Sequence, residues 1–105
     1  MQWVNVFAYG TSNQKPVEGQ LTLVTVGAQR ICLLRRGGNV FAFQDNCPHS
    51  GESLSRGKIN YLGEIVCPAH GHCFNIRHGR EVAERSADLE TFPVREDDSG
   101  LYIAI

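Results

Sequence analysis

The amino-acid sequence predicts an all-β protein, and two features of the chain carry this prediction. Apolar and polar residues alternate in short runs of about four to eight residues, which is the period of a strand with one buried face. Gly, Pro, Asn and Asp separate these runs at close intervals, as they do in antiparallel sandwiches and barrels. A chain of 105 residues has room for one core, so we expect a single domain spanning residues 1–105.

The longer strands are expected near the two ends of the chain. They cover, in order, residues 3–8, 21–26, 30–35, 40–43, 91–95 and 101–105. Residues 37–39, Gly-Gly-Asn, supply the positive φ angles that a tight hairpin requires. Residues 10–19 are expected to form a loop, and residues 81–89 a loop or one helical turn. We therefore predict a β base built from residues 1–44 and 80–105.

The segment from Asp45 to Gly79 differs in character from the rest of the chain. It holds all four His residues and two of the four Pro residues. Only short strands fit there, around residues 58–60, 64–66 and 73–76. This concentration of possible metal ligands predicts a loop-rich, ligand-bearing insertion at residues 45–79.

Two short Pro-containing segments in this insertion carry the chemistry. Residues 47–49 read Cys-Pro-His, and residues 67–70 read Cys-Pro-Ala-His. Each Pro fixes its own φ and biases the Cys before it toward extended backbone. Gly51 and Gly71, each shortly after a His, allow the backbone to approach a bound group or to turn with positive φ. Two thiolates and two imidazoles suit a [2Fe–2S] centre in which two His bind one iron.

The two segments resemble the cluster loops of Rieske-type ferredoxins. The residues that carry the resemblance are 47–54, Cys-Pro-His-Ser-Gly-Glu-Ser-Leu, and 67–74, Cys-Pro-Ala-His-Gly-His-Cys-Phe. The resemblance extends to the flanking strands at 40–43 and 89–94, and it covers the chain roughly from residue 21 to the end. It implies a Rieske-like antiparallel β-sandwich with a loop-rich cluster-binding insertion.

The same resemblance implies which residues bind the cluster, a single [2Fe–2S] group of Rieske type. Cys47 and Cys67 would bind one iron, and His49 and His70 would bind the other through ring nitrogens. The remaining ring N–H groups of both His residues would then face outward at the tip of the protein.

Residues that the chain lacks narrow the resemblance to one branch of the family. High-potential respiratory Rieske proteins join their two loops by a disulfide, at positions where this chain has Glu52 and Ala69. They also place a Ser and a Tyr near the sulfurs, where this chain has His72 and Phe74. Without these two hydroxyl donors the reduced cluster, which carries more negative charge, is less stabilised, so it is harder to reduce. We therefore expect a ferredoxin with a potential at the low end of the Rieske range, roughly −150 mV.

A structural zinc site is the alternative interpretation of the four ligands. Zinc accepts two Cys and two His, but its usual spacings pair Cys with Cys and His with His. Here each loop pairs one Cys with one His. The spacing favours the cluster, and a zinc-stapled binding module stays open as the alternative.

The remaining Cys, His and aromatic residues are expected to have structural roles. Cys32 lies in an apolar strand pattern and is expected to be a buried hydrophobe, and Cys73 a structural thiol near the cluster. His72 is expected to be an exposed loop residue and His78 a surface turn residue. Trp3 and the Phe residues are expected to lie in the core.

Composition and charge argue against several classes of partner. The formal net charge is −1 and the sequence pI is about 6.4, which argues against a nucleic acid or a membrane surface. The N-terminus lacks a signal-peptide pattern, and no run approaches the ~18 apolar residues of a membrane span. We expect a soluble, cytoplasmic protein, and in that reducing compartment four Cys favour metal binding over disulfides.

These features predict a one-electron carrier rather than an enzyme. The sequence shows no nucleophile–base constellation, nucleotide loop or second metal site. By the resemblance, the protein takes an electron from a flavin-containing reductase and passes it to a terminal oxygenase, meeting each transiently and as a monomer. The small Rieske subunit of an NAD(P)H-dependent nitrite reductase is the second interpretation that the loops allow.

Overall fold

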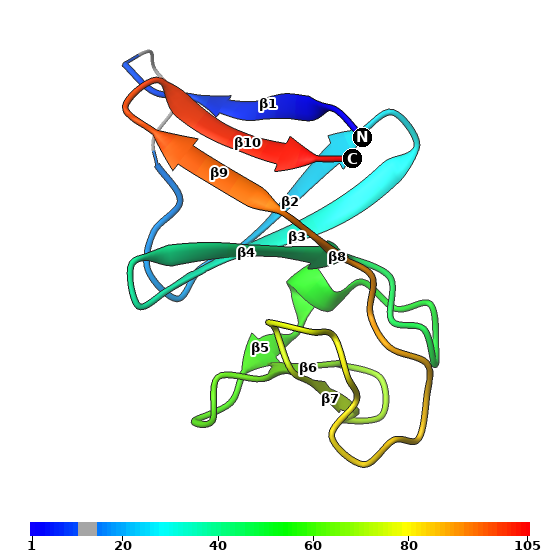
Figure 1. Cartoon of the computed structure of the whole chain (residues 1–105). Helices are drawn as coiled ribbons and strands as arrows, with labels where there is room; N and C mark the ends of the chain where they lie inside the picture. The colour runs from blue at the N-terminus through cyan, green and yellow to red at the C-terminus, as the bar shows by residue number, and fades with distance from the viewer. Residues whose placement is uncertain (11–14) are drawn as a thin grey trace.

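A computed structural model of the chain describes residues 1–10 and 15–105, and the part of the expected loop at 11–14 lies outside them. The described residues form strands in antiparallel sheets and one short 3-10 helix, so the prediction of an all-β fold is confirmed (Figure 1). The elements in chain order are β1 (Trp3–Ala8), β2 (Leu21–Val26), β3 (Gln29–Arg36), β4 (Asn39–Gln44), η1 (Leu54–Arg56), β5 (Lys58–Ile59), β6 (Ile65–Val66), β7 (Cys73–Phe74), β8 (Thr91–Phe92), β9 (Val94–Asp97) and β10 (Gly100–Ala104).

The sheets are stacked in layers. The first sheet has the strand order β1-β10-β9, the second β2-β3-β4-β8 and the third β5-β6-β7. The first and third sheets lie on opposite sides of the second (Figure 1). The two ends of the chain lie side by side, because Gln2 and Ile105 exchange two backbone hydrogen bonds of 2.9 Å each.

Strand β3 of the second sheet is buried on both faces along its central residues, which explains its unbroken apolar run. Side chains alternate between the two faces of a strand, so Ile31 and Leu33 point one way and Cys32 and Leu34 the other. All four are fully buried. The first pair packs against the first sheet, and the second pair joins the core beneath the ligand-bearing segment. The second sheet therefore contributes side chains to both hydrophobic cores, one on each of its faces.

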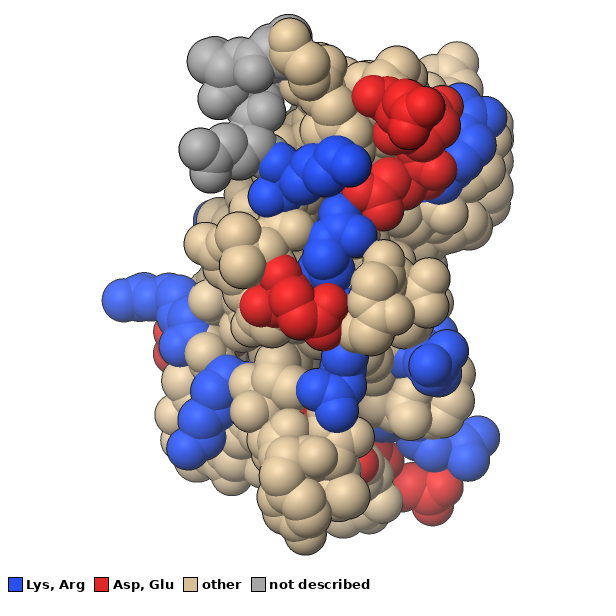
Figure 2. Space-filling view, turned by 90° about the vertical axis from the view of Figure 1, so that its left-hand side faces the viewer, with Lys and Arg blue, Asp and Glu red and all other residues tan. Residues whose placement is uncertain are grey.

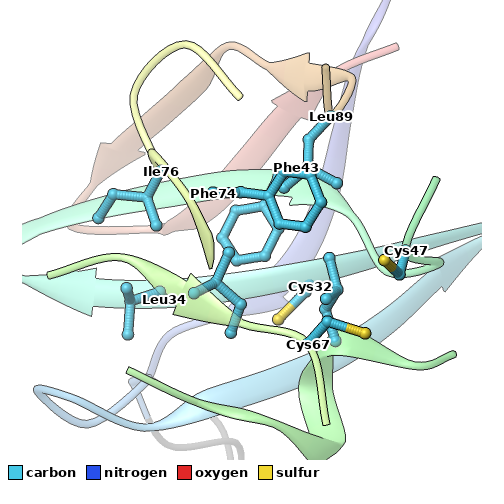
Figure 3. Close-up of a cluster of buried hydrophobic side chains, with 10 residues drawn as sticks. Cys32, Leu34, Phe43, Cys47, Cys67, Phe74, Ile76 and Leu89 are labelled. Carbon is cyan, nitrogen blue, oxygen red and sulfur yellow. The ribbon is translucent and has the colours of Figure 1, made fainter. Parts of the chain in front are cut away.

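The core beneath the ligand-bearing segment supports both ligand loops. Phe43 from β4 and Phe74 from β7 lie at its centre, and Cys47 and Cys67 lie at its edge (Figure 3). Burying one Phe side chain stabilises a fold by about 1.5–3 kcal/mol. This apolar floor therefore fixes the two loops on the β base.

The structure differs from the expected strand at 91–95 and decides between the two possibilities for residues 81–89. Pro93 divides the expected strand at 91–95 into β8 and β9, which pair in different sheets, because proline has no N–H for a strand ladder. Residues 81–89 form turns and irregular backbone rather than a helical turn. The short helix at Leu54–Arg56 has no counterpart in the sequence pattern.

The prediction that Trp3 lies in the core is wrong. Its side chain is 45% exposed, because it lies on the outer face of the first sheet, away from the buried Leu101 and Ile103. The guanidinium of Arg95 stacks over the rings of Trp3 and Tyr102, 4.9 Å from each centroid. The Phe prediction is confirmed for the three buried members, Phe43, Phe74 and Phe92, while two are half-buried, Phe7 and Phe41.

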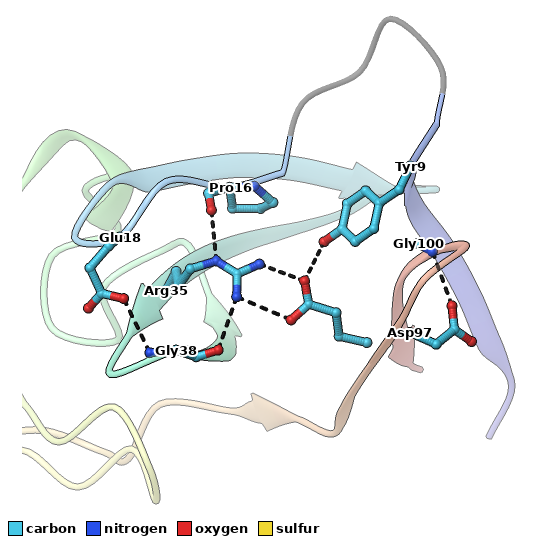
Figure 4. Close-up of polar contacts among 8 residues, drawn as sticks. Tyr9, Pro16, Glu18, Arg35, Gly38, Asp97 and Gly100 are labelled. Atoms are coloured by element: carbon cyan, nitrogen blue, oxygen red, sulfur yellow. Dashed lines mark hydrogen bonds and ion pairs between the residues drawn. The ribbon is translucent and has the colours of Figure 1, made fainter.

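A polar network joins the first sheet to the second, away from the ligand loops (Figure 4). Arg35 donates from Nη2 to Oε2 of Glu96 at 2.6 Å and from Nε to the carbonyl of Pro16 at 2.7 Å. Tyr9 donates its hydroxyl to the same carboxylate at 2.7 Å, and burial together with this bond raises the pKa of Tyr9 to about 12. On the face shown in Figure 2, Lys and Arg residues also lie beside Asp and Glu residues.

No helix in the described residues is long and apolar enough to cross a membrane.

Candidate metal centre

The first ligand loop follows β4 and is closed by two backbone hydrogen bonds. The N–H of Cys47 donates to the carbonyl of Glu52 at 2.8 Å, and the N–H of Gly51 donates back to the carbonyl of Cys47 at 2.7 Å. Gly51 has a φ of +76°, a left-handed conformation that favours glycine. The expected positive φ is therefore present.

The second ligand loop joins β6 to β7 and repeats the same turn. The N–H of Cys67 donates to the carbonyl of His72 at 2.8 Å, and the N–H of Gly71 donates to the carbonyl of Cys67 at 3.1 Å. Gly71 has a φ of +73°. The two loops are thus copies of one turn that begins at a Cys.

The structure brings the four predicted ligands together as two pairs. Cys47 and Cys67 form the inner pair, 2% and 1% exposed. His49 and His70 form the outer pair and are both exposed, with ring centroids 5.1 Å apart and ring planes at 77°. A mixed-ligand [2Fe–2S] cluster requires this division, because thiolates bind one iron and imidazoles the other.

Hydrogen-bond donors surround the sulfur of Cys67. The hydroxyl of Ser50, from the other loop, lies 3.5 Å from Cys67 Sγ. Burial raises the pKa of the Cys67 thiol, but the Ser50 hydroxyl and the backbone of Ala69 and His70 outweigh it, so the pKa is lowered. This favours the thiolate, the form that binds metal. Sequence reasoning missed Ser50, because a Ser beside a Gly indicates a turn first.

The prediction that His72 is an exposed loop residue is wrong. Its ring is 6% exposed and stacks on the ring of His49, with centroids 3.9 Å apart and planes at 23°. The chain after β7 turns back so that Glu81 and Arg85 lie near this ring. Burial, and then the nearby guanidinium of Arg85, lower the pKa of His72. Its Nδ1 is buried without a hydrogen-bond partner in the part of the chain that the structure describes.

Glu81 is a buried acid that the sequence reasoning missed. Its carboxylate accepts hydrogen bonds from Nε and Nη2 of Arg85 at 3.1 and 2.9 Å, and from the N–H of Cys73 at 3.3 Å. The hydrogen bonds from Arg85 outweigh burial and lower the pKa of Glu81 to about 2. The spacing of four residues between Glu and Arg is the signal that could have revealed the pair. The pair fastens the turn after β7 to the second ligand loop.

Asp45 fastens the first ligand loop to β3. Its buried carboxylate accepts hydrogen bonds from the N–H of Ser55 at 2.8 Å, from Nη2 of Arg30 at 3.0 Å and from the hydroxyl of Ser53. Burial alone would raise the pKa of Asp45, but these hydrogen bonds outweigh it and lower the pKa. The backbone two residues before Cys47 is therefore held in place.

The other Cys and His residues match their expected surroundings. Cys32 is fully buried, and burial raises the pKa of its thiol to about 12. Cys73 is half-buried and donates its thiol to the carbonyl of Gly71 at 3.4 Å. Burial raises the pKa of that thiol as well. His78 lies exposed in a turn, where its Nδ1 accepts the N–H of Arg80 at 3.2 Å.

The donor set fits a dinuclear cluster. Two thiols, one with a lowered pKa, lie beneath two imidazoles, and the unpartnered Nδ1 of His72 lies beside them. In residues 1–10 and 15–105, no three His, Cys, Asp or Glu side chains are grouped as a single metal ion would need.

Relatives of the chain point to the same cofactor. A family model described as the Rieske [2Fe-2S] domain matches residues 3–93. The chain is 33% identical over 76 residues to the 3-phenylpropionate/cinnamic acid dioxygenase ferredoxin subunit of Photorhabdus laumondii, which covers 71% of this chain and 72% of that one. It is 37% identical over 75 residues to apoptosis-inducing factor 3 of Mus musculus, which covers 71% of this chain and 11% of that one.

Solved structures share the fold along the whole chain. In a complex of reduced oxygenase and oxidised ferredoxin in carbazole 1,9a-dioxygenase, one chain matches with a TM-score of 0.79 at 32% identity, covering 96% of this chain and 100% of that one. A putative NADPH nitrite reductase small subunit matches with a TM-score of 0.81 over 100% of both chains, but at 20% identity it shows the fold alone. The chain belongs to the Rieske [2Fe-2S] domain family, and its cofactor is one [2Fe–2S] cluster of Rieske type.

Proposed function

We propose that Cys47 and Cys67 hold one iron of the cluster and that His49 and His70 hold the other. The division of the four side chains into a buried thiol pair and an exposed imidazole pair supports this assignment. The lowered pKa of Cys67 supports it too, because iron binds the thiolate. In this proposal residues 45–79 form the cluster-binding insertion of a single domain.

The protein acts as a one-electron carrier. When bound, the cluster supplies reversible one-electron storage. The apolar floor around Phe43 and Phe74 excludes water from the thiol side, while His49 and His70 leave an edge open to partners. This asymmetry, buried at the thiols and exposed at the imidazoles, is the observation that carries the proposal.

The electron comes from a flavin-containing reductase and goes to a terminal oxygenase. Two similarities support the oxygenase end of this route: one relative is a dioxygenase ferredoxin subunit, and one similar structure is a complex of oxygenase and ferredoxin. Electron-transfer encounters of this kind are small and transient. The protein works as a cytoplasmic monomer and has no catalytic activity of its own.

An EPR-monitored redox titration of the full chain, purified anaerobically with its cluster, tests this proposal. We expect one reversible one-electron wave with about one spin per chain. The variant Cys67→Ser, which removes one buried thiol, should lose most of the signal. A protein that shows no reversible wave would contradict the carrier function. Stable co-purification with a large subunit would instead favour the nitrite reductase interpretation.

A further inference from the structure

The contact between His49 and His72 joins the two ligand loops. His49 lies in the first loop, and His72 closes the second loop through its backbone carbonyl, which accepts the N–H of Cys67. The two rings lie 3.9 Å apart and nearly parallel. His70, the other proposed imidazole ligand, meets His49 edge to face at 77°. The His49 ring is therefore nearly parallel to one neighbour and nearly perpendicular to the other.

The burial of His72 needs an explanation. A polar ring nitrogen that is buried without a partner destabilises a fold, so such groups are few in native proteins. His72 is 6% exposed, and its Nδ1 has no partner in the described residues. The turn at Glu81 and Arg85, fastened to Cys73, keeps the ring in this place. The fold thus keeps the imidazole of His72 buried, in a place where its flat face stacks on His49.

We propose that His72 is a positioning residue that holds the imidazole of His49 in the orientation for cluster binding. This inference rests on the proposed ligation of iron by His49. The stacked pair links the two loops. Stacking of flat rings fixes ring orientation as well as distance.

Two variants of similar size separate stacking from simple filling of space. His72→Phe keeps a flat ring and His72→Leu does not, while both are apolar and suit a buried position. His78→Leu is the matched control, because His78 is an exposed His in a neighbouring turn. Each full-length protein is purified with its cluster and reduced. Pulsed EPR then measures the two ligand-nitrogen couplings, and absorbance follows cluster loss in the presence of a chelator.

We expect His72→Phe and His78→Leu to match the wild type in both measurements. In His72→Leu, one of the two nitrogen couplings should shift or broaden while the other is kept. Its cluster should be lost roughly 2- to 10-fold faster, the range that one aromatic stack corresponds to. If only the His72→Leu variant fails to retain a cluster, that result also supports the positioning role of His72.

Equal behaviour of the Phe and Leu variants would overturn the inference. If both match the wild type, the stack is dispensable, and if both are equally perturbed, the ring nitrogen matters instead. A Phe variant more perturbed than the Leu variant would overturn it as well. The wild-type spectrum separates this failure from failure of the proposed function. Two nitrogen couplings in the wild type establish His ligation whatever the variants show.

Discussion

Gly51 and Gly71 occupy equivalent positions in two copies of one turn. Each donates its N–H to the carbonyl of the Cys that begins its loop, at 2.7 and 3.1 Å. A third copy lies between Asn75 and Arg80, where Gly79 donates to the carbonyl of Asn75 at 2.8 Å with a φ of +82°. That copy has Asn in place of Cys. The turn is therefore a structural unit of this segment, and the Cys and His placed on it make it a ligand loop.

Replacing Gly71 by Ala tests the backbone requirement of the turn. A Cβ at Gly71 meets no atom within 4 Å, so the cost comes only from the φ of +73°. We expect a loss of about 1–2 kcal/mol in the free energy of unfolding, measured by denaturant titration. Gly79→Ala should cost more, because its Cβ would lie 2.2 Å from the carbonyl oxygen of Leu89. A Gly71→Ala protein as stable as the wild type would refute this account of the turn.

Ser50→Ala tests the hydroxyl that lies 3.5 Å from Cys67 Sγ. A donor to a ligand sulfur stabilises the reduced cluster, which carries one more negative charge. Removing a hydrogen bond of about 0.5–1.5 kcal/mol should lower the midpoint potential by roughly 20–65 mV in a one-electron couple. A redox titration measures the shift, and Ser99→Ala, far along the chain in the turn before β10, serves as the control. An unchanged or raised potential would show that the hydroxyl does not donate to this sulfur.

The ion pair between Glu81 and Arg85 predicts a pH-dependent stability. The folded-state pKa of Glu81, about 2, lies below the ordinary carboxyl value, so the charged form stabilises the fold. This contribution is complete above pH ~4.5 and is lost as the pH falls from there toward 2. Glu81→Gln should therefore destabilise the protein at pH 7 by about 1–3 kcal/mol. The difference from wild type, measured by urea titration, should shrink as the pH falls from 4.5, and a constant difference would contradict the ion-pair account.

A basic groove near the second ligand loop predicts that anionic redox reagents are attracted to this end of the protein. The groove has a volume of about 430 Å³, and Arg56, Lys58 and Pro68 are among its lining residues. The double variant Arg56→Gln, Lys58→Gln should slow the one-electron oxidation of the reduced protein by anionic ferricyanide. We expect a roughly 2- to 10-fold effect at low salt that fades near 1 M salt.

Two further measurements complete this test of the groove. Lys15→Gln with Arg95→Gln removes the same charge from the β base and is the matched control. Oxidation by a cationic cobalt complex should not be slowed by the groove variant. Equal slowing by both double variants would show that net charge, and not the groove, sets the rate.

Residues with strong local signals were predictable from the sequence. The two loops begin with Cys-Pro, a pair that restricts the backbone on its own, and the structure has both loops where the sequence pattern places them. The run from Ile31 to Leu34 indicated a strand, but its burial on both faces depends on a third sheet that has only two-residue strands. Such short strands carry little periodicity of their own.

Residues whose surroundings depend on distant chain segments were not predictable. His72 follows a Gly in a polar loop, and its burial arises from the stack with His49 and the turn near Glu81. Trp3 is the opposite case, because an aromatic residue in a strand pattern indicates a core position, yet its face of the sheet lies outside. Ser50 reaches across to Cys67 from the other loop, a contact that no local pattern encodes.

The low-temperature EPR spectrum of the dithionite-reduced protein, taken with iron, sulfide and zinc analysis, tests the central claim most directly. The proposed ligation by Cys47, Cys67, His49 and His70 predicts a rhombic signal with an average g below that of an all-Cys [2Fe–2S] cluster. It also predicts two irons and two sulfides per chain. A colourless, EPR-silent protein that holds stoichiometric zinc and no sulfide would contradict the account and make the four ligands a structural clip.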